Sequence, residues 1–264
     1  MSHKHVPVVI LCGGRGTRLK EETEVKPKPM VEIGGRPILW HIMKRYAYYG
    51  FRDFVLCLGY KGDKIKEYFL NYEAMNNDFT VTLGKQNRIT FHTDHREKDW
   101  SITLVDTGED TMTGSRVKRI ERYITGDDFM LTYGDGVSDI DMKALYAFHR
   151  GHRRIGTVSA VRPSSRFGEI IVKGAFATRF SEKPQTTQGL VNGGFFVFKK
   201  KFFSYLSDKS DSYLEREPLE QLAEDRQLCV NVHTGFWQCM DTQRELDLLT
   251  HLWKSGNAPW KAWE

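Results

Sequence analysis

A glycine-rich stretch near the N-terminus contains the residues best suited to binding phosphate. It runs from Leu11 to Leu19, directly after a short apolar run, and Lys28 follows it within the sequence Lys-Pro-Lys-Pro-Met. Glycines let the backbone come close to a ligand and point successive N–H groups at it. Arg15, Arg18 and Lys28 add positive charge that attracts phosphate oxygens. The stretch therefore predicts a phosphate-binding loop at the end of a strand.

This loop matches neither of two familiar phosphate-binding patterns. A P-loop needs four residues between a glycine and Gly-Lys-Ser/Thr, and this stretch does not supply them. The dinucleotide pattern G-x-G-x-x-G fits Gly14 and Gly16, but its third glycine falls on Leu19, where close helix packing requires Gly or Ala. The remaining alternative is a tight turn with solvated arginines.

Two aspartates lie in stretches that are typical of ligand sites. Asp135 stands between two glycines after the apolar run 128–132, and open α/β sheets bind ligands at the carboxyl ends of their strands. Mg²⁺ prefers oxygen ligands and often bridges to substrate phosphates, so Asp135 is a candidate ligand. An Asx turn explains Gly-Asp-Gly equally well. Asp241 marks a third candidate site, and a plain helix start at Thr242 is the competing interpretation.

The order of apolar patterns predicts an α/β fold. Strands are expected at 6–11, 53–58, 101–106, 128–132, 155–161, 192–198 and 228–232, and helices at 38–49, 63–72, 139–149, 215–223 and 243–254. This alternation indicates a Rossmann-like, mostly parallel sheet flanked by helices. Alternating residues in 79–92 and 166–180 predict two antiparallel hairpins added to it.

The length and composition are those of a globular protein with one core. We expect residues 1–264 to form a single domain, since the chain is 264 residues long. No apolar run approaches the roughly 18 residues of a membrane span, and the N-terminus lacks a secretion signal, so we expect a cytoplasmic protein. The cysteines are widely spaced and indicate reduced core residues rather than a zinc site or disulfides: Cys12, Cys57, Cys229 and Cys239.

The net charge of +5 is modest and spread along the chain, which suits an acidic small molecule better than a nucleic acid. A basic helix that contains Arg116, Lys118, Arg119 and Arg122 is the one feature that favours nucleic acid, and such helix faces are usually just solvated. We therefore expect neither nucleic acid nor a membrane as a partner. The aromatic C-terminal segment, with Trp260 and Trp263, is expected to pack on the domain or on a neighbouring subunit.

Several motifs together resemble the sugar-nucleotide pyrophosphorylases. They are LCGGRGTRL, KPKPMVEIGGRPILWHIMK, YGDGVSDI, SEKP, NGGFFVF, GFWQCMDT and APWKAW. The resemblance extends from about Val6 to the end of the chain, with Arg15 where many relatives carry Leu or Met and Cys12 where they carry Ala. It implies the nucleotide-diphosphosugar transferase type of α/β fold. It also implies a mainly nucleotide-binding half, about 1–135, and a mainly sugar-phosphate half, about 136–264.

The resemblance also implies a reaction and the residues that perform it. A sugar-1-phosphate oxygen attacks the α-phosphorus of a nucleoside triphosphate, and pyrophosphate leaves. The implied catalytic residues are Arg15, Lys28 and Asp135, and the implied Mg²⁺ ligands are Asp135 and Asp241. The implied nucleotide-binding residues are Leu11, Cys12, Gly13, Gly14, Arg15, Gly16, Thr17, Arg18, Lys28, Thr111, Arg116 and Gly134. Glu182, Lys183 and Asn192 are implied for the sugar phosphate.

The wording of two motifs favours particular substrates. Tyr-Gly-Asp-Gly and the terminal Ala-Pro-Trp favour, by resemblance, the cytidylyl-transferring members, so we expect CTP and glucose 1-phosphate as substrates and Mg²⁺ as cofactor. The alternatives are UTP, dTTP or another hexose phosphate, and a nucleotide-sensing module without turnover. The resemblance further implies a homo-oligomer, a hexamer in the family, and a role in deoxysugar and polysaccharide biosynthesis of the O-antigen type.

Overall fold

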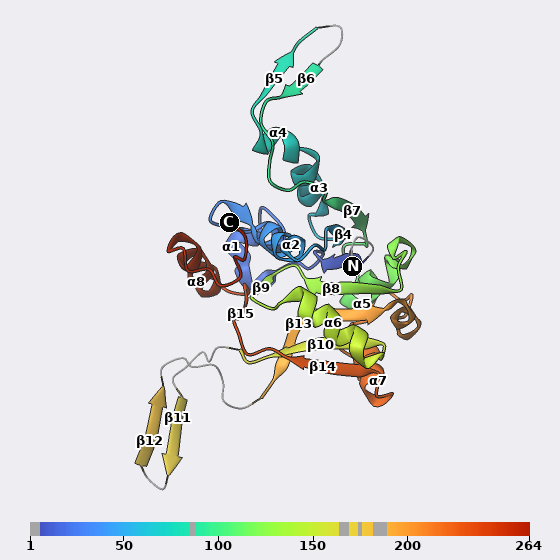
Figure 1. Cartoon of the computed structure of the whole chain (residues 1–264), viewed down its shortest axis with the longest axis vertical. Coiled ribbons are helices and arrows are strands. Elements are labelled where there is room, and N and C mark those ends of the chain that lie inside the picture. Colours follow the sequence, from blue (N-terminus) through green and yellow to red (C-terminus); the bar gives the residue numbers. More distant parts are fainter. Residues whose placement is uncertain (1–5, 85–87, 164–168, 174–175, 182–188) are drawn as a thin grey trace.

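The computed structural model describes residues 6–84, 88–163, 169–173, 176–181 and 189–264. Its centre is a seven-stranded sheet made of β1 (Val8–Leu11), β4 (Asp53–Leu58), β7 (Ser101–Asp106), β8 (Asp128–Tyr133), β10 (Gly156–Val161), β13 (Val191–Lys199) and β14 (Leu228–Val232). The strand order is β14-β10-β13-β8-β1-β4-β7 (Figure 1). These strands match the runs that the apolar patterns predicted.

Most neighbouring strands of this sheet are parallel. β1 pairs in parallel with β4 and β8, β4 with β7, and β10 with β14. β13 runs antiparallel to both of its neighbours, β8 and β10. The prediction of a mostly parallel sheet is therefore confirmed, with one reversed strand inside it.

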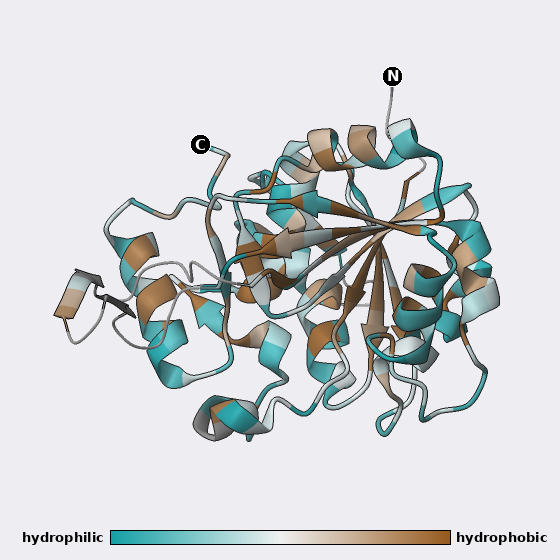
Figure 2. Ribbon diagram, turned by 90° about the horizontal axis from the view of Figure 1, so that it is seen from below, coloured by the Kyte–Doolittle hydropathy of each residue, from teal (hydrophilic) through white to brown (hydrophobic). Residues whose placement is uncertain are grey.

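Helices cover both faces of the sheet and enclose two cores. The helices are α1 (Lys20–Thr23), α2 (Ile38–Tyr48), α3 (Gly62–Leu70), α4 (Tyr72–Asn76), α5 (Thr113–Arg119), α6 (Met142–His152), α7 (Glu217–Glu224) and α8 (Gln243–Lys254). Alternate residues of a strand point to opposite faces. Val8 and Ile10 accordingly join the core beneath α2, α6 and α8, whereas Val9 and Leu11 join the core beneath α5 and α7. Figure 2 shows the apolar strands gathered between these helices.

Two pairs of short strands lie outside the main sheet, and one of them connects distant parts of the chain. They are β2 (Glu32–Ile33), which pairs with β3 (Arg36–Pro37), and β9 (Gly136–Ser138), which pairs with β15 (Trp237–Cys239). In the second pair Cys239 lies opposite Gly136, and the N–H of Met240 donates to the carbonyl of Asp135 at 2.8 Å. This pairing brings the segment before α8 next to the end of β8.

Two antiparallel hairpins stand apart from the main sheet, as predicted. β5 (Phe79–Thr82) pairs with β6 (Arg88–Phe91), and β11 (Glu169–Lys173) pairs with β12 (Phe176–Ser181). The β5–β6 hairpin projects beyond α4, away from the body of the molecule (Figure 1). Its placement could not be predicted from the alternation alone. None of the helices in the described ranges is long and apolar enough to cross a bilayer.

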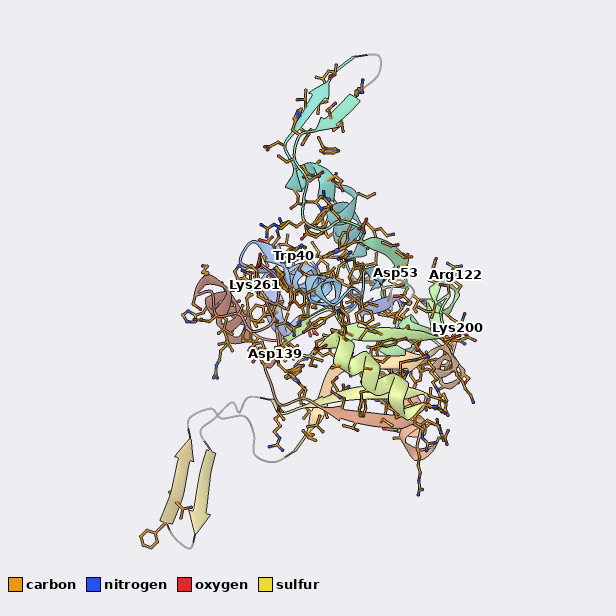
Figure 3. All side chains as sticks on the ribbon, in the orientation of Figure 1. Trp40, Asp53, Arg122, Asp139, Lys200 and Lys261 are labelled. Atoms are coloured by element: carbon orange, nitrogen blue, oxygen red, sulfur yellow. The ribbon has the colours of Figure 1, made fainter. Side chains whose placement is uncertain are left out.

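The C-terminal segment packs on the domain, as predicted for its tryptophans. Trp260 is fully buried in the core with α2 and α8. Its indole N–H donates to Nδ1 of His41 at 3.4 Å, and its carbonyl accepts from Arg45 at 3.3 Å. Trp263 lies edge-on to Trp40 with 5.7 Å between ring centroids, and Figure 3 shows this segment beside α2, where Trp40 and Lys261 are labelled. Burial lowers the pKa of His41 to about 4, so this imidazole is neutral inside the core at neutral pH.

Candidate functional site

The glycine-rich loop lies where β1 and β8 end side by side. Leu11 pairs with Tyr133, and the N–H of Gly134 donates to the Leu11 carbonyl at 3.0 Å. A Cβ at Gly134 would approach that carbonyl oxygen to 2.8 Å and Pro29 to 2.9 Å. Only glycine fits such a close approach of two backbones. The parallel sheet therefore places the loop and the segment that carries Asp135 at one edge.

Arg116 holds the loop in place through a hydrogen bond to its backbone. Its side chain is buried and donates to the carbonyls of Leu58 at 3.0 Å and Gly13 at 3.1 Å. A Cβ at Gly13 would meet the Arg116 guanidinium at 2.3 Å, so the loop needs glycine there. The expectation of one solvated basic helix as far as Arg122 is wrong, because Arg116 points inward and α5 ends at Arg119. This burial removes Arg116 from any surface that could contact nucleic acid.

One pocket opens over the loop, with a volume of about 250 Å³. Its walls are formed by Leu11, Cys12, Gly13, Gly14, Gly16, Thr17, Arg18, Lys28, Pro29, Arg116, Tyr133, Gly134 and Asp135. Pro29 and Tyr133 are the two lining residues that sequence reasoning missed. Pro29 follows Lys28 and Tyr133 precedes Gly134, and Tyr133 is the last residue of β8. Their position beside predicted site residues was the signal in the sequence that could have found them. The other lining residues were predicted for the nucleotide or the metal.

Lys28 lies between the two aspartates predicted to bind metal. Its Nζ is 2.6 Å from Oδ2 of Asp135 and also donates to Oδ1 of Asp241. The lysine is only 8% exposed, and its stem passes Gly16, where an added Cβ would lie 3.1 Å from Cβ of Lys28. Gly16 also has a φ of +62°, which glycine adopts without strain. The loop is thus shaped to let this lysine reach the carboxylates.

The charges of this cluster support one another. Burial opposes the charged form of Lys28, but the contacts with Asp135 and Asp241 outweigh it and raise the lysine pKa. Burial also opposes ionisation of Asp241, and the hydrogen bond and charge of Lys28, with the charge of Arg18, outweigh it and lower the carboxyl pKa. Nη1 of Arg18 lies 2.9 Å from Oδ2 of Asp241. Lys28 and Asp241 are therefore both ionised at neutral pH.

The start of α8 positions Asp241. Thr242 is the N-cap, and its side chain and that of Glu245 form a capping box. Oε2 of Glu245 accepts from the N–H groups of Asp241 at 2.7 Å and Thr242 at 2.8 Å. The predicted helix start at Thr242 is confirmed, and because Thr242 supplies the cap, the Asp241 carboxylate is left to pair with Lys28 and Arg18.

The donor set at this cluster fits a hard divalent cation. The carboxylates of Asp135 and Asp241 converge on a single cationic atom, and carboxylate oxygens are the ligands that Mg²⁺ prefers. Cys239 and Glu245 also lie near Asp241, with their ligand atoms within 4.8 Å of one another. Glu245 is engaged in the capping box, however, and burial raises the pKa of the Cys239 thiol to about 12. The oxygen pair is the better-suited ligand set.

Arg15 and Thr111 occupy places that the sequence did not indicate. The exposed guanidinium of Arg15 contacts Oδ1 of Asp110 at 2.9 Å and Oε1 of Glu109 at 3.0 Å. Arg15 is absent from the residues that line the pocket in the described part of the chain. Thr111 is buried and accepts from Arg119 at 2.8 Å. In this structure Arg15 is therefore paired with the loop that follows β7.

The sugar-phosphate residues are described only in part. Asn192 lies near the start of β13, and its Oδ1 accepts from the N–H of Gly194 at 2.8 Å. Its side chain is fixed over the glycine pair that precedes the apolar part of the strand. Glu182 and Lys183 lie outside the described residues.

Sequence comparisons find relatives that span nearly the whole chain. A family model described as nucleotidyl transferase matches residues 7–242. A glucose-1-phosphate cytidylyltransferase of Salmonella typhimurium is 48% identical over 257 residues, which cover 97% of this chain and 99% of that protein. A probable glucose-1-phosphate cytidylyltransferase of Bacillus subtilis is 44% identical with the same coverage.

Solved structures share the fold at low sequence identity. HddC from Yersinia pseudotuberculosis, complexed with GMP-PN, has a TM-score of 0.69 and 21% identity and covers 94% of this chain and 99% of its own. The inositol-1-phosphate CTP transferase from T. maritima has a TM-score of 0.68 and 15% identity, and both chains are covered completely. The family model and the curated relatives span nearly all of the sequence, so the chain belongs to the nucleotidyl transferase family.

Proposed function

We propose that the protein transfers the cytidylyl group of CTP to α-D-glucose 1-phosphate, which yields CDP-glucose and pyrophosphate. The observation that carries this proposal is Lys28, held between Asp135 and Asp241 at the pocket over the glycine-rich loop. The base and the sugar are supported by the near full-length similarity to glucose-1-phosphate cytidylyltransferases. We also propose that residues 1–264 form one domain, with a mainly nucleotide-binding half at about 1–135. The protein would act in the cytoplasm and serve polysaccharide biosynthesis.

The chemistry requires positioning and charge rather than a base. An oxygen of the sugar phosphate forms a bond to the α-phosphorus of CTP, and the bond from that phosphorus to the bridging oxygen of the β-phosphate breaks. Pyrophosphate leaves with the electron pair. The nucleophile is already an anion, so no side chain has to remove a proton from it. Preorganised positive charge and alignment dominate reactions of this kind.

The predicted site residues have different roles in this scheme. The backbone N–H groups of the loop and Arg18 would hold the triphosphate, with Arg15 toward the β- and γ-phosphates and Lys28 on the α-phosphate. Asp135 and Asp241 would hold Mg²⁺, whose charge offsets that of the phosphate oxygens. Glu182, Lys183 and Asn192 would bind the sugar phosphate. Thr111 and Arg116 would support the nucleotide pocket.

A panel of triphosphates tests the base assignment. Pyrophosphate release is measured with glucose 1-phosphate and, in turn, CTP, UTP, dTTP, ATP and GTP. We expect CTP to give the highest kcat/KM. Faster release with UTP or dTTP would overturn the choice of cytosine. Tight binding of CTP without any release of pyrophosphate would instead support a nucleotide-sensing module.

A second test concerns the cation. Asp241→Asn removes one anionic ligand, so we expect the Mg²⁺ concentration for half-maximal activity to rise by on the order of tenfold or more. Asp247→Asn is the matched control, because Asp247 lies just over one turn into α8 and is exposed. The measurement is an Mg²⁺ titration of initial rates. An unchanged Mg²⁺ requirement in Asp241→Asn would remove Asp241 from the metal site.

We also propose that the protein is a homo-oligomer, and the β5–β6 hairpin supports this. Its paired residues Phe79 and Phe91, and Val81 and Ile89, form one apolar face. These side chains are 41–53% exposed although they are large and apolar. An isolated two-stranded hairpin is marginally stable in water, so covering this face would stabilise it.

The oligomer is tested by light scattering after size exclusion. We expect a mass well above the 30.6 kDa of one chain, six times that value for a hexamer, and a smaller assembly for the double substitution Val81→Ser with Ile89→Ser. Thr80→Ser on the opposite face is the control. A monomeric wild-type protein would refute the oligomer, and an unchanged mass in the double variant would exclude this face as the interface.

A further inference from the structure

We propose that Lys28 and Arg18 are internal counter-ions of the Asp135–Asp241 pair, and that a divalent cation takes their place when it binds. This inference rests on the proposed function for the identity of the cation site, and it goes beyond it in stating what occupies that site beforehand. The lysine bonds to both carboxylates, and the arginine lies 2.9 Å from the second oxygen of Asp241. Both cations are thus on the oxygens that a metal would use.

The charges of the cluster balance in this state. Two carboxylates face one ammonium and one guanidinium group, so their charges cancel. Glu245 is a further carboxylate close to Asp241, and it is bonded to backbone N–H groups at the start of α8, where the positive end of the helix dipole offsets it. A divalent cation would supply the same total positive charge that Lys28 and Arg18 now supply.

The exchange also explains where the displaced groups go. Lys28 and Arg18 both line the pocket over the glycine-rich loop, and a triphosphate that chelates one divalent ion still carries excess negative charge. Two released cations would match that excess. The backbone at Lys28 is restrained because Pro27 and Pro29 flank it, so the movement falls on the flexible side-chain stem. Binding of the metal would therefore also free Lys28 and Arg18 to contact the phosphates.

Competition between like charges gives the proposal a measurable consequence. In the absence of nucleotide a metal ion has to displace the ammonium group of Lys28, a residue that is only 8% exposed, from both of the carboxylates that would bind the metal. Removing that group should leave two carboxylates aimed at one point. We expect the full-length protein with Lys28→Met to bind Mn²⁺ at least about tenfold more tightly than the wild type, although it turns over more slowly.

The test is a Mn²⁺ titration without nucleotide, in which electron paramagnetic resonance reports the free ion. Arg18→Met changes a side chain that is 68% exposed, so it should fold normally and raise the affinity by a smaller factor, about threefold. Lys26→Met, two residues away, should leave it unchanged. Adding Asp135→Asn to Lys28→Met should abolish the gain in Mn²⁺ affinity. That result would locate the bound ion at the Asp135–Asp241 pair.

Two outcomes would overturn the proposal. One is that Mn²⁺ binds no more tightly to Lys28→Met and Arg18→Met than to the wild type. The other is that no variant binds Mn²⁺ at all, since freed carboxylates should do so. The titration uses neither CTP nor a sugar phosphate, so a wrong base or sugar in the proposed function would leave its result standing. Conversely, the triphosphate panel can succeed while this titration fails.

Discussion

Substitution of Lys28 by alanine is expected to lower kcat by about 10²–10³-fold, the scale of removing one preorganised charge-stabilising group. The ammonium group is buried at the edge of the pocket, where charge interactions are stronger than in water. KM for CTP should change less than kcat, because the group acts mainly on the charge that develops at the α-phosphate. The measurement is steady-state release of pyrophosphate at saturating Mg²⁺.

Lys26→Ala provides the matched control for this substitution. Lys26 belongs to the same Lys-Pro-Lys-Pro sequence, but its Nζ pairs with Glu22 at 3.4 Å and it does not line the pocket. We expect its kcat to stay within about twofold of the wild type, since such partly exposed pairs contribute little. If Lys28→Ala kept near wild-type activity, Lys28 would have no catalytic role. Equal losses in both variants would point to damage of the local fold instead.

The largest stability effect is expected at Trp260. Its side chain is fully buried against Phe236 and Trp253, with ring centroids 5.6 Å and 6.4 Å away. Trp260→Ala should lower the free energy of unfolding by about 3–5 kcal/mol, through lost burial and the cavity that remains. It also removes the N–H that donates to His41. Urea unfolding followed by circular dichroism measures the change.

Lys261→Ala is the control for the C-terminal segment. Lys261 is exposed beside the same tryptophans, so its loss should change the free energy of unfolding by less than about 0.5 kcal/mol. A loss below about 1 kcal/mol in Trp260→Ala would show that the segment adds little to the core. A large loss of stability in both variants would indicate that any substitution in this segment destabilises the fold, whether or not the side chain is buried.

The sequence predicted most strands because buried strands are short apolar runs bounded by turn residues. β4 has the predicted bounds, 53–58, and β7 those of 101–106. The direction of β13 could not be predicted, because the run Phe195–Phe198 is equally apolar in a parallel and in an antiparallel strand. The burial of Arg116 was also hidden, since its neighbours Lys118 and Arg119 make the helix look solvated. Its partners include the carbonyls of Gly13 and Leu58, which are far away in sequence.

The candidate site was predictable in its parts but not in its pairings. The glycine-rich loop and Asp135 could both be placed at the carboxyl ends of strands, because each follows a buried apolar run. Their meeting with Asp241 depends on β9 and β15, which have three residues each and are too short to give a pattern. The pairing of Arg15 with Asp110 is an exposed ion pair, and no sequence rule specifies such a contact.

The pairing of β9 with β15 also limits when the site can form while the chain is being synthesised. Lys28 and Asp241 are 213 residues apart in sequence, whereas the glycine-rich loop and the first strands emerge early. A nascent chain can fold its N-terminal part before the segment that carries Asp241 has left the ribosome. Until then Lys28 has only Asp135 as a carboxylate partner from this cluster. The complete cluster is therefore among the last features of the protein to form during translation.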